Sequence, residues 1–113
     1  MSKRGPHNGR YILDEQGRPV PEPDLFKWAM WLEKDRRRIV AREPLDGDIE
    51  VVTLFLGLDH RLSGDGPPIL WETYIFGGGP DLRGVASRCA GSREQAEAMH
   101  SETVERTRAR PHH

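Results

Sequence analysis

Two apolar segments, residues 49–58 and 69–76, dominate the hydrophobic pattern of the chain. Both are rich in β-branched and aromatic residues, which favour strands, and the polar, Gly/Pro-rich segment 59–68 separates them. This pattern predicts a central antiparallel hairpin with a long loop at its tip. Residues 49–58 would be apolar on both faces of a strand. That is typical of the middle of a sheet, or of a strand covered by helices on one face and by a partner on the other.

A helix is predicted before the hairpin, from about residue 25 to residue 35. Asp24 is a suitable N-cap, because its carboxylate can accept hydrogen bonds from the free N–H groups of a first turn. Apolar residues recur at helical spacing and would form one buried stripe, which three further apolar residues widen. The stripe contains Leu25, Trp28, Ala29 and Leu32, and the residues that widen it are Phe26, Met30 and Trp31.

A second helix is predicted near the end of the chain, from about residue 93 to residue 108. Ser92 and Gln95 have the spacing of a capping box, in which each side chain satisfies a backbone N–H of the helix start. The inner face of this helix would carry Ala96, Met99, His100, Thr103 and Val104.

Shorter segments complete the order of elements. Residues 11–13 and 18–20 would form short strands at the start, and residues 38–43 and 85–90 would flank the central hairpin. Strands in series with a helix near each end predict an α+β fold. We expect an antiparallel sheet of about four to five strands with two helices packed on one face.

Length and composition bound the class of protein. A chain of 113 residues suits one domain, expected over residues 11–108, between a flexible basic arm (1–10) and a short tail (109–113). Lys+Arg number 17 and Asp+Glu 18, and this balance argues against a dedicated nucleic-acid coat. The single cysteine, Cys89, cannot form an internal disulfide. Without an apolar run of bilayer length or a secretory signal, a cytoplasmic protein with no membrane contact is expected.

Asp59, His60, Glu72 and His100 are the candidates for chemistry. Their oxygen and nitrogen atoms could ligate a metal such as zinc, or form a His/carboxylate acid–base pair of a hydrolase. The spacing matches no strong metal motif, so the alternative is structural. In that interpretation Asp59 caps backbone N–H groups of the loop, His60 is a surface residue and His100 is a hydrogen-bonded core histidine. No catalytic residue and no cofactor are predicted outright.

Tryptophan and arginine content favours an interaction protein. A small sheet cannot easily hide Trp28, Trp31 and Trp71 together, and exposed tryptophan beside arginine is typical of binding hot spots. The arginines could instead be solvated helix-end charges, or could contact nucleic acid, which is possible but not favoured. The predicted partner contacts are Arg36, Arg37, Arg38, Trp31, Asp59, His60, Arg61 and Asp65.

The central hairpin resembles small uncharacterised proteins of bacteriophages and prophages, mostly of actinobacterial hosts. The resemblance is carried by residues 52–60 (VTLFLGLDH), 66–73 (GPPILWET) and 76–78 (FGG), and the start at Tyr11 and both helical segments look similar too. This family brings no activity that can be carried over. The resemblance implies a phage context, in which small proteins without a catalytic motif often act by stoichiometric binding.

The hypothesis from the sequence is therefore a small phage or prophage accessory protein in the cytoplasm of a bacterial host cell. It would bind a host or defence protein complex, for example as an inhibitor of a CRISPR effector or of another host nuclease. A metal-binding protein or metal-assisted hydrolase and a nucleic-acid binder stay open as alternatives. A homodimer also stays open, because a second copy could complete the strand that is apolar on both faces.

Overall fold

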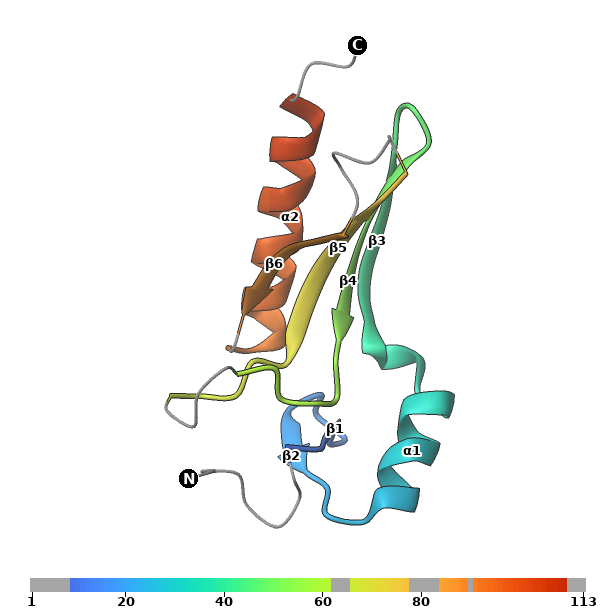
Figure 1. Cartoon of the computed structure of the whole chain (residues 1–113), viewed down its shortest axis with the longest axis vertical. Coiled ribbons are helices and arrows are strands. Elements are labelled where there is room, and N and C mark those ends of the chain that lie inside the picture. Colours follow the sequence, from blue (N-terminus) through green and yellow to red (C-terminus); the bar gives the residue numbers. More distant parts are fainter. Residues whose placement is uncertain (1–8, 62–65, 78–83, 90, 110–113) are drawn as a thin grey trace.

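The computed structural model describes residues 9–61, 66–77, 84–89 and 91–109 (Figure 1). The tail after Ala109 and all but the last two residues of the predicted arm lie outside this part. In chain order the elements are β1 (Tyr11–Leu13), β2 (Pro19–Pro21), α1 (Leu25–Lys34), the 3-10 turn η1 (Arg36–Arg38), β3 (Ile39–Leu45), β4 (Ile49–Phe55), β5 (Trp71–Phe76), β6 (Gly84–Cys89) and α2 (Arg93–Ala109).

The predicted hairpin is confirmed. Strands β4 and β5 pair antiparallel, with Thr53 opposite Thr73 and Val52 opposite Tyr74, and the four-stranded sheet has the order β3-β4-β5-β6. Strands β1 and β2 form a separate two-stranded ribbon. Gly9 and Arg10, which were assigned to the arm, join the fold instead, because the Asp59 N–H bonds to the Gly9 carbonyl and Arg10 bridges Leu58.

Helix α2 covers one face of the four-stranded sheet and contacts all four strands. Its predicted inner residues are all buried, and Thr107 joins them: Ala96, Met99, His100, Thr103, Val104 and Thr107. Because strand side chains alternate between the two faces, Thr53 and Thr73 point to α2 while their neighbours Val52 and Glu72 point away. In the described part of the chain, no helix covers that opposite face (Figure 1).

We call this uncovered side the outer face. Its apolar residues, placed by strand alternation and register, are Ile39, Val52, Leu54, Tyr74 and Phe76. Its charged residues are Arg42, Glu50, Glu72 and Arg88.

The α+β class with two helices and antiparallel strands is confirmed, but α1 does not lie beside α2 on the sheet. It lies against β1, past the end of the sheet. The aromatic rings of Trp31, Phe55 and Trp71 join the two regions, with centroid distances of 5.6 Å and 5.5 Å. Two further links hold α1 there: the Trp28 indole bonds to the Gly57 carbonyl, and Arg37 bonds to β1 at Leu13.

The predicted stripe of α1 is only partly correct. Trp28, Trp31 and Leu32 are half-buried, whereas Leu25 and Ala29, also assigned to it, are exposed. No residue of α1 is fully buried. The reason is its position, because a helix that contacts a short ribbon and the end of a sheet has room to bury only one narrow side.

Candidate functional site

His100 belongs to a buried hydrogen-bonded chain. Its Nδ1 lies 2.9 Å from the Thr53 hydroxyl, which in turn lies 2.6 Å from the Thr73 hydroxyl. Burial lowers the pKa of His100, and the nearby Glu43 carboxylate opposes that effect only in part. The structural interpretation of His100 is therefore confirmed: it is a buried, hydrogen-bonded core histidine.

Glu72 lies on the other side of the sheet, with a side chain that is only 1% exposed. Its Oε1 is 3.3 Å from His60 Nδ1 and 3.2 Å from Arg88 Nε. The Glu72 carboxylate and burial both raise the pKa of Tyr74, so this phenol stays protonated at neutral pH. His60 and Arg88 both approach this oxygen, but neither oxygen of the buried Glu72 carboxylate has a hydrogen-bond partner in the described part of the chain.

The predicted four-residue metal or catalytic set is not assembled. His60 and Glu72 lie close together, but His100 bonds to Thr53 on the face that α2 covers, so the sheet itself separates the two groups. Among the residues that the structure describes, no three histidine, cysteine or acidic side chains gather closely enough to hold a metal ion. The His60–Glu72 contact is a 3.3 Å approach without a hydrogen bond, and Arg88 lies near the same carboxylate oxygen.

Asp59 is a buried cap of the loop, as its structural interpretation predicted. It accepts hydrogen bonds from the backbone N–H groups of Arg61 and Ile69, and Arg61 Nε lies 2.6 Å from its second oxygen. Burial alone would raise the pKa of Asp59, but these donors outweigh it and the pKa is lowered. Asp59 and Arg61, both predicted partner contacts, are thus engaged inside the loop, and Asp65 lies outside the described residues.

Two of the three consecutive arginines also have internal roles. The Arg37 guanidinium bonds to both oxygens of Asp35 and to the backbone carbonyls of Leu13 and Asp14. Its hydrogen bond to the Asp35 side chain is the main reason that the pKa of Asp35 is lowered. Arg38 donates to the carbonyls of Leu32 and Phe55.

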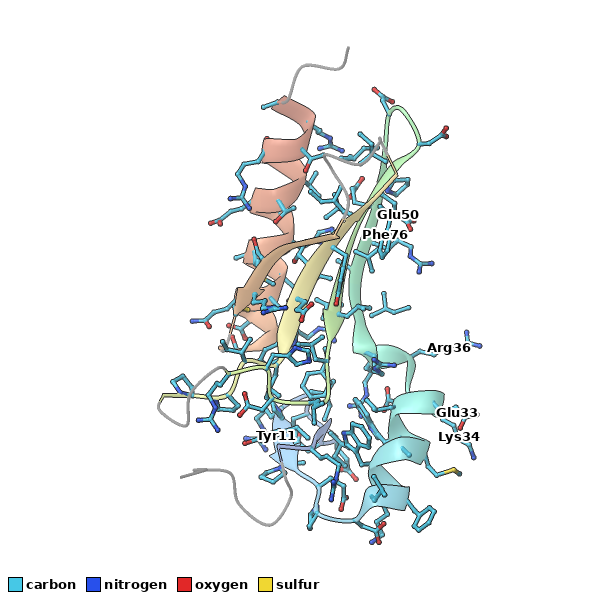
Figure 2. The ribbon with its side chains drawn as sticks, viewed as in Figure 1. Tyr11, Glu33, Lys34, Arg36, Glu50 and Phe76 are labelled. Carbon is cyan, nitrogen blue, oxygen red and sulfur yellow. The ribbon has the colours of Figure 1, made fainter. Side chains whose placement is uncertain are left out.

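Arg36 differs from its two neighbours. It is exposed and has no ion-pair partner in the described part of the chain. Together with Trp31 it lines a shallow hollow of about 460 Å³ where α1 meets η1, and the other lining residues are Met30, Lys34 and Asp35. Asp35 is neutralised by Arg37, so the free charges at this hollow are those of Lys34 and Arg36. In Figure 2 both side chains point away from the body of the molecule.

Next to this hollow, α1 exposes large apolar side chains. Phe26 is 81% exposed and Met30 is 49% exposed. We define the α1 surface as Phe26, Met30, Trp31, Lys34 and Arg36. It brings together two predicted contact residues, Trp31 and Arg36, and adds three that the sequence analysis had not assigned to binding.

Phe26 and Met30 were predicted to widen the buried stripe, and that prediction is wrong. The sequence did contain a signal that Phe26 and Met30 lie together: the two residues are four apart, so they share a side of the helix. That side is turned away from Trp28 and Leu32, which pack inward.

In the described part of the chain, neither helix has both the length and the apolar character needed to cross a membrane. Comparison of the chain with protein-family models, with curated proteins and with solved structures gives no significant match.

Proposed function

We propose that this protein acts by stoichiometric binding to another protein, and that the α1 surface is its docking site. The observation that carries the proposal is the exposure of Phe26 and Met30 beside a hollow whose free charges are both positive. Burial of one such apolar side chain is worth about 1.5–3 kcal/mol, so contact with a partner would recover energy that the free protein lacks.

The chemistry of the α1 surface defines the kind of partner. Lys34 and Arg36 favour a partner segment that carries acidic side chains, and Phe26 and Met30 favour apolar side chains beside them. A helix that presents apolar anchors one turn apart is suited to the groove of another protein. The partner surface would therefore be an apolar groove with an acidic rim.

The proposed cellular role follows from the resemblance of residues 52–60 and 66–73 to phage and prophage proteins. We propose a phage or prophage accessory protein that acts in the bacterial cytoplasm on a host or defence complex, such as a CRISPR effector or another nuclease. Among the described residues no three histidine, cysteine or acidic side chains gather to hold a metal ion, which gives the metal-assisted alternative no support.

The nucleic-acid alternative gains less support from the geometry. Arg37 and Arg38 are engaged with carboxylate and carbonyl groups of their own chain, and Arg42 lies 3.6 Å from Glu50. At the α1 surface Arg36 and Lys34 remain, and two charges are few for a site that depends on many phosphate contacts.

Affinity purification from bacterial lysate, followed by mass spectrometry and reconstitution with purified partner, tests the proposal. Wild type should retain one protein at a fixed molar ratio. Phe26→Ser and Arg36→Glu should each weaken the reconstituted complex about tenfold to a hundredfold, as expected for the loss of one anchor. Arg108→Glu, the same charge change on α2, should leave it intact. Equal binding by all these variants would refute the role of the α1 surface.

A further inference from the structure

The outer face of the sheet is a second surface, distinct from the α1 surface, and it is partly apolar. Ile39 is 43% exposed and Phe76 is 49% exposed. The Tyr74 and Phe76 rings stack with centroids 5.8 Å apart and planes inclined by 19°. Figure 2 shows Phe76 and Glu50 directed away from α2.

Charge on the outer face indicates what covers it. Arg42 lies 3.6 Å from Glu50 and both side chains are exposed, whereas the partner of Arg88, Glu72, is buried. A strongly acidic or basic partner would meet a like charge beside each opposite one at the Arg42–Glu50 pair. A second copy offers Glu50 to Arg42 and Arg42 to Glu50, because a two-fold interface pairs each surface with itself.

The Arg42–Glu50 pair is suited to exchange between copies. The Arg42 side chain is 57% exposed and that of Glu50 is 37% exposed, so their contact within one chain is worth little in water. Pairing Arg42 of one copy with Glu50 of the other would place the same two charges in a drier environment, where their attraction is stronger. We infer that this protein forms a two-fold dimer in which the outer faces of two copies pack together.

The size of the face sets the expected strength of the dimer. Four strands about 4.8 Å apart, with a rise of about 3.3 Å per residue, make a face about 20 Å on each edge. Two such faces bury about 800–1,000 Å² in total, below the range of about 1,200–2,000 Å² that is typical of stable complexes. The dimer is therefore weak and depends on protein concentration.

Sedimentation equilibrium over a hundredfold range of concentration tests the inference. Wild type should shift from monomer to dimer as the concentration rises, and Phe76→Ser should remain monomeric. Phe26→Ser, a matched change on the α1 surface, should still form the dimer. Wild type that is monomeric at every concentration would overturn the inference.

A mixing experiment separates contact between copies from contact within one chain. Arg42→Glu alone and Glu50→Arg alone should each remain monomeric, because like charges would face each other across the two-fold axis. An equimolar mixture of the two variants should form a heterodimer, which no repair within one chain can produce. A mixture that stays monomeric, or single variants that dimerise like wild type, would contradict the outer face as the interface.

The same variants distinguish a failure of the dimer inference from a failure of the proposed docking site. Loss of partner binding by Phe26→Ser with an unchanged monomer–dimer equilibrium supports both inferences. If Phe76→Ser weakens the reconstituted partner complex as strongly as Phe26→Ser does, and wild type does not dimerise, the outer face belongs to the partner and the dimer is refuted. The proposed function would stand in that case.

Discussion

The indole Nε1 of Trp28 donates a hydrogen bond of 2.7 Å to the backbone carbonyl of Gly57. The same carbonyl accepts the backbone N–H of Tyr11 at 2.8 Å. A single peptide group after β4 therefore joins α1 and β1 to the sheet. This contact positions α1, and with it the exposed surface that we propose as the docking site.

Gly57→Ala should destabilise the protein. Gly57 has φ +74°, and a Cβ there would lie 2.5 Å from Leu32 Cδ2, so backbone strain adds to displacement of the Leu32 side chain. We expect a loss of about 2 kcal/mol in the free energy of unfolding, measured by urea denaturation. The control is Gly17→Ala, with φ +80° and no atom within 4 Å of the new Cβ, which should cost only about 1 kcal/mol. Equal losses for the two variants would show that the contact with Leu32 carries no weight.

Asp59→Ala should unfold the loop and cost about 2–4 kcal/mol, because the N–H groups of Arg61 and Ile69 lose their buried acceptor. Removal of the exposed carboxylate of Glu15 should change the free energy of unfolding by less than about 0.5 kcal/mol. The folded pKa of Asp59 is lowered, so its contribution is complete above the ordinary value of 3.8 and is lost as the pH falls through the lower folded value. A wild-type stability that is unchanged through that acid range would contradict this assignment.

His100 should make the protein less stable as the pH falls below 6.5, the ordinary value for histidine. Burial lowers the folded pKa of His100, so the unfolded chain binds a proton at a pH where the folded chain does not, and stability rises with pH. Urea denaturation at a series of pH values should show a smaller slope for His100→Gln than for wild type. Parallel curves for wild type and His100→Gln would rule out this origin of the pH dependence.

Substitution of Arg37 should lower stability, whereas substitution of Arg36 should lower only partner affinity. Arg37→Ala removes bonds to Asp35, Leu13 and Asp14 and should cost about 2 kcal/mol of stability. Arg36→Ala should leave stability within about 0.5 kcal/mol of wild type and weaken only partner binding. Thermal unfolding measures the expected loss of stability, and a binding titration on the same two variants measures the expected loss of partner affinity. Loss of stability in Arg36→Ala would remove it from the binding surface.

Local signals were sufficient for most of the fold. The Asp24 side chain accepts the N–H groups of Phe26 and Lys27 at 2.9 Å and 3.0 Å, as predicted for an N-cap. Ser92 accepts the N–H of Gln95 at 3.2 Å, which is one of the two bonds of the predicted capping box. Alternation along β5 also places Glu72 and Thr73 on opposite faces, so the sequence already contained the reason that Glu72 and His100 are apart.

The binding surface depended on information that local patterns lack. Helical spacing shows that α1 has apolar residues on two sides, but not that only the side with Trp28 meets the rest of the fold. Likewise, residues 36–38 are all arginine, so residue type does not distinguish them. Only the direction of the 3-10 turn decides which of them reaches Asp35, which reaches the Phe55 carbonyl and which remains free.

Isothermal titration of the reconstituted partner tests the docking site most directly. Our account predicts one partner molecule per chain for wild type, an affinity about tenfold to a hundredfold weaker for Phe26→Ser, and no heat of binding for the double variant Phe26→Ser/Arg36→Glu. Thermal unfolding of that double variant should match wild type, which shows that the fold is intact. A double variant that binds the partner with wild-type affinity would contradict the account.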